Sequence, residues 1–442
     1  MSAALFFERH KKGQRALLLN VARQAQITAA GRSVRESEFA ALALAAGCEI
    51  LAEVRSTPRQ LSAASLVGAG KVEELAALQA ALEADVLLVD HPLSPVQERN
   101  LERAVGCRVI DRATLILDLF AQRARSFEGK LQVELAQLRH LSTRLVGGWR
   151  HLERQRGGIG LRGPGETQLE TDRRLVARRM RQLERRLERV SRVRREGRRA
   201  RRRAGLPIVA LVGYTNAGKS TLFNRLTGAG VEAADRLFAT LDTTLRKARL
   251  PAAGEWIVSD TVGFIRDLPH ELISAFRATL DEARDADLLL HVVDRSAPDW
   301  RERAADVETV LIELGIEHLP RLTVHNKIDR LDRAPEIVRG SDGTPLAVCM
   351  SAARDSDLTA LGTALGERLG GLSIDRWIKV PYAAARLRAR LFALGAVAAE
   401  QAQDGASRLH IHLSSQHVHE LSRLPGIDGL TARGQLLAAR GR

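Results

Sequence analysis

The sequence predicts a multidomain α/β protein, and three observations lead to that fold class. The chain has 442 residues, more than one hydrophobic core usually serves. Short apolar runs alternate with amphipathic stretches in two separate regions, as in parallel sheets covered by helices. Between these regions, apolar residues recur at helical spacing over two long stretches. We therefore expect an N-terminal α/β domain, an antiparallel helical hairpin with a glycine-rich loop, a phosphate-loop domain and a small C-terminal α/β domain, at 1–126, 127–204, 205–371 and 372–442.

The N-terminal domain should be built on a parallel sheet. Apolar runs predict its strands at 16–21, 49–54, 86–90 and 107–110. Amphipathic stretches predict its helices at 36–46, 71–81, 95–104 and 113–123. This alternation favours parallel pairing, because parallel neighbours need a long crossover connection that is usually a helix.

A short segment of this domain, Gly68-Ala69-Gly70-Lys71, resembles half of a phosphate-binding loop. Ser65 replaces the earlier glycine of such a loop, and Val72 follows the lysine where Ser or Thr would be needed. Two interpretations stay open. The departures favour a glycine-rich helix start, and the alternative is a second, weaker nucleotide site.

The helical hairpin is predicted by two apolar stripes, which should pack as antiparallel helices. The first stripe contains Leu131, Leu135, Leu138, Leu141 and Leu145, and the second contains Leu169, Val176, Met180, Leu183, Leu187, Val190 and Val193. The connection between them, 147–168, holds seven glycines: Gly147, Gly148, Gly157, Gly158, Gly160, Gly163 and Gly165. Loops of this length without secondary structure are usually functional or disordered.

The positive charge of the chain is concentrated in the second hairpin helix. The net charge is +15, and the stretch 173–203 alone holds 16 arginines against three glutamates. A basic segment in an otherwise nearly neutral chain indicates a dedicated polyanion-binding element. The alternative is a solvated coiled-coil face, although balanced charge would serve solubility better.

The phosphate-loop domain begins with an apolar strand run, 209–212, and a helix is expected at 221–226. Between them stands the pattern Gly213-Tyr214-Thr215-Asn216-Ala217-Gly218-Lys219-Ser220. Glycines let successive backbone N–H groups curl around phosphates, and the start of the helix adds positive potential. Lys219 should reach the β- and γ-phosphates, and the Ser220 hydroxyl should bind Mg²⁺.

Two further motifs follow predicted strands at the distances that a GTPase requires. Asp260-Thr261-Val262-Gly263 follows 256–259, so Asp260 should hold Mg²⁺ and the Gly263 N–H should sense the γ-phosphate. Asn326-Lys327-Ile328-Asp329 follows 322–325. The Asp329 carboxylate can accept from both N1–H and N2–H₂ of guanine, and adenine lacks that pair of donors. Backbone N–H groups of Ser351, Ala352 and Ala353 can contact guanine O6. These motifs together predict a magnesium-dependent GTPase.

The C-terminal domain offers no catalytic constellation. It is expected to contain a strand at 376–380, a helix at 383–402, a strand at 408–413 and a stretch with helical spacing at 416–424. Elsewhere, Cys48, Cys107 and Cys349 are far apart and read as small buried hydrophobes rather than as a disulfide framework or a zinc site. No apolar run is long enough to span a bilayer, and the N-terminus lacks the signal-peptide pattern, so a cytoplasmic protein without membrane insertion is expected.

The motifs resemble those of the translation-factor-related GTPases, and over roughly 15–420 the chain is similar to one family, the HflX ribosome-associated GTPases. Three segments carry the resemblance: 65–74, the glycine-rich segment 157–174, and 237–242, which is similar to the first switch of the family. The resemblance implies that Thr240 binds Mg²⁺ in the GTP state. It places the nucleotide against 213–221, the switch residues and the later motifs, which adds Thr221, Phe238, Ala239, Leu241 and Asp242 to the residues above. Lys219, Thr240 and Gly263 are then the expected catalytic residues.

The resemblance also implies partners. The family binds the large (50S) ribosomal subunit and is associated with splitting or rescuing stressed ribosomes, and its hairpin and glycine loop approach ribosomal RNA. The expected partners are therefore GTP or GDP, the large subunit and its RNA, and the chain is expected to act as a monomer. Two alternatives stay open: a signalling GTPase without an RNA partner, which the charge distribution disfavours, and an RNA-binding or RNA-remodelling NTPase, which Asp329 disfavours.

Two positions bear on hydrolysis. Phe264 stands after Gly263, where many switch GTPases place a water-orienting glutamine, so intrinsic hydrolysis should be slow and need help. Asn216 matches the loop asparagine of potassium-activated relatives, which makes K⁺ a candidate second cation. The alternative is a loop asparagine that bonds its own backbone.

Overall fold

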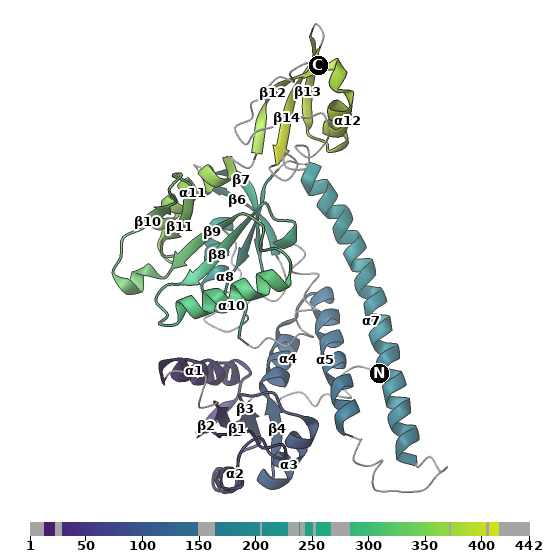
Figure 1. Cartoon of the computed structure of the whole chain (residues 1–442), viewed down its shortest axis with the longest axis vertical. Coiled ribbons are helices and arrows are strands. Elements are labelled where there is room, and N and C mark those ends of the chain that lie inside the picture. The colour runs from purple at the N-terminus through teal and green to yellow at the C-terminus, as the bar shows by residue number, and fades with distance from the viewer. Residues whose placement is uncertain are drawn as a thin grey trace. The chain divides into compact units, whose positions relative to one another are not determined.

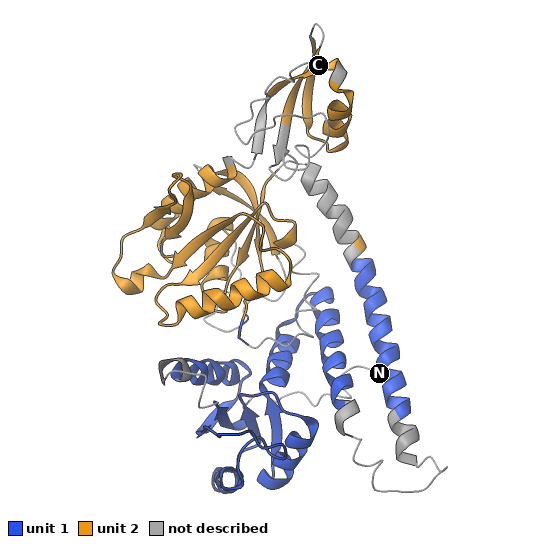
Figure 2. Cartoon of the chain, viewed as in Figure 1, with its two compact units in different colours: residues 1–190, 235–242, 265–277 blue, residues 191–234, 243–264, 278–442 orange. Residues whose placement is uncertain are grey.

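The computed structural model (Figure 1) describes residues 13–22, 29–148, 164–203, 206–228, 238, 244–250, 253–266, 283–370, 373–403 and 406–414. The chain divides into two compact units (Figure 2). The first comprises 1–190, 235–242 and 265–277, and the second comprises 191–234, 243–264 and 278–442. Two short segments from within the predicted phosphate-loop domain thus belong to the first unit. The four-domain division of the sequence stays a prediction.

The N-terminal sheet is parallel, with strand order β2-β1-β3-β4. Its strands are β1 (Arg15–Val21), β2 (Glu49–Ser56), β3 (Val86–Val89) and β4 (Arg108–Asp111), and its helices are α1 (Ala29–Ala45), α2 (Ala69–Leu82), α3 (Pro95–Val105) and α4 (Arg112–Arg123). The core holds fully buried leucines and valines from the central strands, such as Leu17, Leu19, Leu87 and Val89. The predicted α/β fold class is confirmed.

The start of α2 settles what the glycines at 68 and 70 do locally. Gly68 is the residue before the helix and has an ordinary φ of −68°. The Lys71 ammonium lies 2.6 Å from the carboxylate of Glu74, one turn further along. The segment is therefore a glycine-rich helix start.

The hairpin consists of α5 (Phe127–Gly148) and α7 (Pro164–Arg203), which run antiparallel in Figure 1. Their apolar stripes meet in one cluster, in which Leu131, Leu135 and Leu138 pack with Val176 and Leu183. The predicted connection, 147–168, is too long at both ends, because α5 continues to Gly148 and α7 already begins at Pro164. Proline suits a first helical position, since its missing N–H has no partner there anyway. The rest of the glycine-rich connection, 149–163, lies outside the described residues.

The larger sheet has seven strands in the order β10-β11-β9-β8-β5-β7-β6. They are β5 (Ile208–Val212), β6 (Thr244–Leu250), β7 (Gly254–Asp260), β8 (Leu288–Asp294), β9 (Arg321–Asn326), β10 (Glu336–Arg339) and β11 (Pro345–Cys349). The inner strands are parallel, and the edge strands β6 and β10 are antiparallel to their neighbours. Parallel strands end at one edge of the sheet, where α/β proteins bind their ligands.

Three helices in the described part of the chain accompany this sheet: α8 (Lys219–Thr227), α10 (Trp300–Glu313) and α11 (Leu358–Gly370). Two short 3₁₀ helices, η2 (Ile328–Leu331) and η3 (Asp355–Asp357), follow β9 and β11. The core includes the fully buried Trp256 and Phe223. Residues 239–243 and 267–282 lie outside the described residues.

The C-terminal sheet is antiparallel, in the order β12-β14-β13. Its elements are β12 (Ser373–Pro381), η4 (Tyr382–Ala384), α12 (Ala385–Ala393), β13 (Val397–Gln403) and β14 (Ala406–Ser414). The predicted helix 383–402 is wrong in its second half. Gly395, at φ +67°, turns the chain, and 397–403 pairs with β14, so tertiary pairing overrides the helix propensity of an alanine-rich run. The stretch 416–424 lies outside the described residues.

No described helix is both long and apolar enough to cross a bilayer. Cys48 is buried, and burial raises the pKa of its thiol to about 12. Cys107 and Cys349 are half-buried, and burial likewise raises both of their pKa values. These thiols are held in their protonated, weakly reactive form.

Candidate nucleotide site

The segment between β5 and α8 forms a tight loop that requires glycine at two positions. Gly213 has φ +151° and Gly218 has φ +98°. A Cβ on Gly213 would lie 2.2 Å from the carbonyl oxygen of Val292, and one on Gly218 would lie 2.1 Å from Nδ2 of Asn326. Asn216, which is exposed, adopts φ +60°. The backbone therefore curls back on itself and enters α8 directly, and the positive end of this helix favours an anion in the loop.

Lys219, the first residue of α8, folds over this loop. Its ammonium donates to the carbonyl oxygens of Gly213, at 3.0 Å, and Tyr214, at 2.8 Å. The side chain is buried, and burial lowers its pKa to about 8, although the carboxylate of Asp260 opposes the shift. A buried ammonium that bonds only carbonyl oxygens gains from a nearby phosphate. The same loop buries Thr215 and Ala217, and Thr221 lies in the first turn of α8.

Two oxygen-bearing side chains meet beside the lysine. The Ser220 hydroxyl donates to Oδ2 of Asp260 at 3.2 Å. Asp260 ends β7 and is buried. A hydroxyl and a carboxylate are hard oxygen donors of the kind that Mg²⁺ prefers, so the pair fits this ion. Thr240, the third predicted ligand, lies outside the described residues, and all three metal roles stay predictions.

The segment after Asp260 lies against the phosphate loop. The Thr261 hydroxyl donates to the carbonyl of Leu211 at 2.5 Å. The backbone of Phe264 exchanges hydrogen bonds with the loop, accepting from the Thr215 N–H at 2.7 Å and donating to Gly213 at 3.1 Å. Val262 and Phe264 are buried.

Gly263 is held close to the side chain of Lys219. A Cβ on this glycine would lie 2.9 Å from Nζ of Lys219 and 3.0 Å from Cα of Thr215. Nothing larger than glycine fits without moving one of them. The N–H at 263 thus belongs to the loop region, where a γ-phosphate would lie.

Asn326, at the end of β9, connects two loops of the site. Its Nδ2 donates to the carbonyl of Ala217 at 2.8 Å, and its Oδ1 accepts from the N–H of Ala352 at 2.8 Å. The amide therefore fixes the phosphate loop to the turn after β11. The sequence pattern marks this asparagine but does not reveal that its partners are protein atoms.

The next three residues of the motif differ in whether their side chains are held within the protein or remain available to a ligand. Lys327 has φ +64°, and its ammonium lies 2.7 Å from the carboxylate of Asp294. Ile328 is fully buried. Asp329, in η2, is half-buried and makes no hydrogen bond or ion pair with any described residue. Its carboxylate is the acceptor that remains available to a base.

The turn after β11 carries three N–H groups that were expected to face guanine. The N–H of Ser351 donates to Asp357 at 2.8 Å and that of Ala353 donates to the Ser351 hydroxyl at 3.3 Å, while Ala352 is bonded to Asn326. All three donors thus have protein acceptors, and the bond from Ala353 is the longest. Their contact with guanine O6 stays a prediction.

The predicted switch residues are described only at Phe238. This residue is buried, has φ +56°, and places its ring 4.5 Å from that of Phe120 in α4, which belongs to the same compact unit. Ala239, Leu241 and Asp242 lie outside the described residues. No sequence pattern singles out Phe120, because one aromatic residue on an apolar helix face reads as ordinary core.

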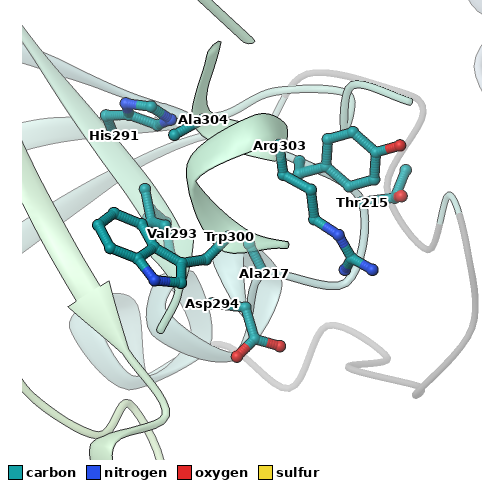
Figure 3. Close-up of a pocket in the computed structure, with 10 residues that line it drawn as sticks. Thr215, Ala217, His291, Val293, Asp294, Trp300, Arg303 and Ala304 are labelled. Carbon is teal, nitrogen blue, oxygen red and sulfur yellow. The ribbon is translucent and has the colours of Figure 1, made fainter. Parts of the chain in front are cut away.

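A small hollow lies behind the phosphate loop, between residues of the loop, β8 and α10 (Figure 3). Arg303 lies on its rim, with its guanidinium 5.2 Å from the ring centroid of Tyr214 and bonded to Asp299. His291 lies on its buried wall, and burial lowers the pKa of this imidazole to about 4. No sequence motif marks α10, from which Arg303 comes.

Family models match three consecutive parts of the chain. A model described as GTP-binding GTPase N-terminal matches 34–121, and the GTP-binding GTPase middle region matches 123–202. A model described as 50S ribosome-binding GTPase matches 208–327. The last range holds the phosphate loop, Asp260 and the start of the guanine motif.

One curated relative matches almost the whole chain, and another matches about three quarters of it. GTPase HflX from Escherichia coli is 50% identical over 409 residues, which cover 92% of this chain and 95% of the relative. GTPase HflX from Magnetococcus marinus is 51% identical over 326 residues, 74% of this chain and 75% of the relative. Among solved structures, a GTP-binding protein from Sulfolobus solfataricus in complex with GDP aligns with a TM-score of 0.42 and 23% identity, over 80% of this chain and 98% of that one.

Proposed function

We propose that this chain, which belongs to the HflX family of GTPases and hydrolyses GTP, does so in association with the large ribosomal subunit, where it splits or rescues stalled or stressed ribosomes. The main observation that supports association with the ribosome is the exposed arginine face of α7. The nucleotide site carries the GTPase part. The two parts can be tested separately.

The arginine face of α7 consists of Arg178, Arg181, Arg185 and Arg189. All four side chains are exposed, and none of them makes an ion pair with any other described residue. The opposite side of α7 packs on α5, where the guanidinium of Arg179 lies 2.7 Å from the carboxylate of Glu134. The exposed arginines therefore do not hold the hairpin together. The positive charges of these arginines repel one another, which costs free energy. This cost is offset when a polyanion such as ribosomal RNA replaces the counterions around them.

The family relationship supports the same partner. The model that matches 208–327 is described as a 50S ribosome-binding GTPase. The hairpin joins α5 to α7 through 149–163, so the glycine-rich segment lies at one end of the arginine helix. We assign ribosomal RNA contact to both parts, and place the protein in the cytoplasm as a monomer.

Within the nucleotide site, the chain's own residues have distinct tasks. Lys219 would exchange its carbonyl bonds for the β- and γ-phosphates, and Asp329 would accept from guanine. Ser220 and Asp260, with Thr240, would hold Mg²⁺, which neutralises phosphate charge when bound. Asn216, exposed on the loop, is the residue that a K⁺ ion would use.

Phe264 cannot orient an attacking water, since its side chain is apolar and buried and its backbone is bonded to the phosphate loop. Intrinsic hydrolysis should therefore be slow. We infer that docking on the large subunit supplies the missing help, because α7 leads into β5 and the phosphate loop with only four residues between helix and strand.

The test is co-sedimentation with large subunits in the presence of a GTP analogue or GDP, over a series of salt concentrations. Replacing Arg178, Arg181, Arg185 and Arg189 with Gln should weaken binding and lower the log–log salt slope by roughly 0.7–0.9 for each phosphate that is no longer bound. GTP affinity should stay the same. The matched control replaces four exposed arginines outside α7 with Gln: Arg59, Arg103, Arg246 and Arg249.

Three outcomes separate the functions. Unchanged subunit binding by the α7 variant means that its charge is a solvated face. GTPase activity without any subunit binding indicates a signalling GTPase. Subunit or RNA binding with equal turnover of ATP and GTP indicates an RNA-remodelling NTPase. Deleting 157–165 should separately reduce subunit-stimulated turnover and ribosome splitting.

A further inference from the structure

The C-terminal sheet has one face covered by α12, and a second face, here called the open face, that no described helix covers. Side chains alternate along its strands, so Ile378 and Val380 of β12 and Leu409 and Ile411 of β14 point to the same side. All four are buried in a cluster with Leu387 and Leu391 of α12. Because side chains alternate along a strand, those between them face away from α12.

The open face carries an aromatic and basic cluster: Trp377 and Lys379 from β12, and Arg408 and His410 from β14. Trp377 lies directly opposite His410 in the register, and Lys379 lies opposite Arg408. The two rings are 5.2 Å apart between centroids, at 41°, and the Arg408 guanidinium lies 5.3 Å from the indole centroid. Lys379 and Arg408 are exposed, and Trp377 and His410 are half-buried.

The described side chains of this face carry only positive charge; the side chain of Asp375, whose backbone pairs with His412, lies outside them. From β13 it receives Ala399 and Gln401, which are exposed and uncharged. Glu400 points to the other side, where its carboxylate lies 2.9 Å from the guanidinium of Arg388 in α12. Among the side chains that the structure describes on the open face, none is acidic.

We propose that this open face binds single-stranded RNA. An unpaired base stacks on the half-exposed Trp377 and His410, and the flanking phosphates lie on Lys379 and Arg408. A sheet surface with central aromatic rings and basic neighbours suits this ligand, because every base has a π-face and the strand adds regularly spaced negative charge. A duplex fits poorly, since its bases are already stacked. The site is separate from the nucleotide site and from the arginine face of α7.

The experiment measures binding of a fluorescein-labelled ten-nucleotide uridine RNA to the full chain. The chain carries the four Arg→Gln replacements in α7, which reduce competing binding of the RNA to the arginine face. Trp377→Ala, and separately the pair Lys379→Gln and Arg408→Gln, should each raise Kd by roughly 5- to 100-fold, the range for removal of one base stack or of phosphate-binding charges. Trp377→Phe should keep most of the affinity, since a phenyl ring still stacks. A duplex of the same length should bind more weakly.

The matched control is the pair Arg386→Gln and Arg388→Gln, which removes the same charge from α12 in the same domain. Its Kd should stay within about twofold of the parent. Circular dichroism checks that each variant is folded. If Trp377→Ala is unfolded, the Kd values of the Lys379/Arg408 pair and of Trp377→Phe test the site instead. If the control pair and the Lys379/Arg408 pair lose the same RNA affinity, the chain binds RNA through its overall positive charge, and the proposed site is wrong. Unchanged RNA binding with weaker binding to ribosomal protein identifies a protein-docking face and also overturns it.

Discussion

Two segments of this chain use nearly the same residues at the start of a helix, and only one of them forms a phosphate loop. Gly68-Ala69-Gly70-Lys71 leads into α2 of the N-terminal sheet, and Gly213 to Lys219 leads into α8 of the larger sheet. At 68 and 70 an added Cβ would meet nothing within 4 Å. At 213 and 218 it would overlap a carbonyl oxygen and the Asn326 amide. Glycine is convenient in the first segment and obligatory in the second.

The two lysines differ in the same way. Lys71 bonds to Glu74, its neighbour on the helix surface. Lys219 is buried over the loop and bonds two carbonyl oxygens, which cannot neutralise its charge. Among the described residues, Lys219 has no anionic partner in hydrogen-bonding contact, which is the state expected of a lysine that binds phosphate.

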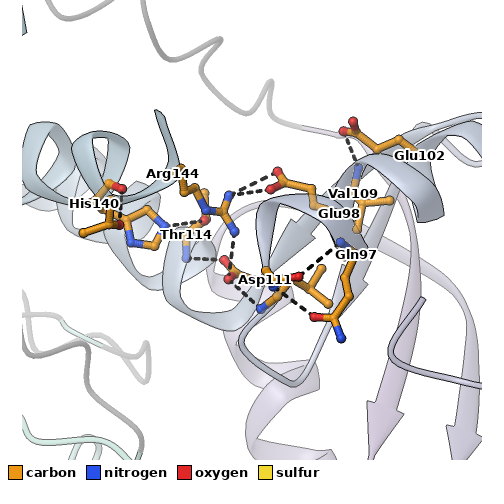
Figure 4. A network of polar contacts seen from close by, with 11 residues as sticks. Gln97, Glu98, Glu102, Val109, Asp111, Thr114, His140 and Arg144 are labelled. Carbon is orange, nitrogen blue, oxygen red and sulfur yellow. Dashed lines mark hydrogen bonds and ion pairs between the residues drawn. The ribbon is translucent and has the colours of Figure 1, made fainter. Parts of the chain in front are cut away.

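The acidic residues at the strand ends of the two sheets also differ in whether they have a protein partner. Asp111, the last residue of β4, accepts from the Arg144 guanidinium at 3.0 Å and from the N–H of Thr114, within the network of Figure 4. Asp90, after β3, is bonded at 2.8 Å to the buried Arg112. Asp329 has no such partner among the described residues. Both sheets place carboxylates at this edge, but only the larger sheet leaves one available to a ligand.

The lysine pair gives the largest expected difference. Lys219→Ala should lower GTP turnover by roughly 100- to 1,000-fold, because the charge that stabilises the transferred phosphate is removed. Lys71→Ala should leave turnover unchanged. Phosphate release from GTP under saturating nucleotide measures both. A comparable loss in Lys71→Ala would show that the N-terminal segment serves the nucleotide as well.

The glycine pair should follow closely. Gly218→Ala should weaken binding of a fluorescent GDP analogue by roughly 100-fold, since left-handed strain alone costs on the order of 1–3 kcal/mol and the Cβ would also displace Asn326. Gly68→Ala and Gly70→Ala should bind like the parent, and both positions have room for a methyl group. If Gly218→Ala still binds the nucleotide tightly, the loop relaxes easily around the added methyl group, and close packing does not determine the loop conformation.

The carboxylates test base recognition. Asp329→Asn should weaken GTP binding by roughly 10-fold and improve XTP binding, because an unpaired polar group in the complex costs about 1–3 kcal/mol. Asp332→Asn, in the same turn, is the matched control and should change neither. Asp111→Asn should lower the melting temperature through Arg144 without altering base preference. If Asp329→Asn still prefers GTP over XTP by the parental margin, another group reads the base.

The sequence predicts these sites unequally, for physical reasons. The phosphate loop is formed by residues that are consecutive in the chain, so its strand, its glycines and its helix can be predicted from the local sequence. The roles of Arg112 and Asn326 depend on partners from distant parts of the chain, which no local pattern reveals. The predicted helix 383–402 failed for the same reason, since only pairing with β14 makes 397–403 a strand.

The smallest expected effect concerns a link between the N-terminal sheet and the nucleotide site. Phe120, from α4, packs on Phe238, which lies two residues before Thr240. A buried aromatic contact holds Phe238 in a left-handed backbone conformation that a phenylalanine rarely adopts. Phe120→Ala should release this segment and change the rate of GDP release by about two- to fivefold, with little effect on affinity at equilibrium. The control is Phe127→Ala, in α5, whose ring is 63% exposed and outside the contact. Stopped-flow displacement of labelled GDP measures the rate. Equal rates in all three proteins would show that the contact between Phe120 and Phe238 does not affect the nucleotide site.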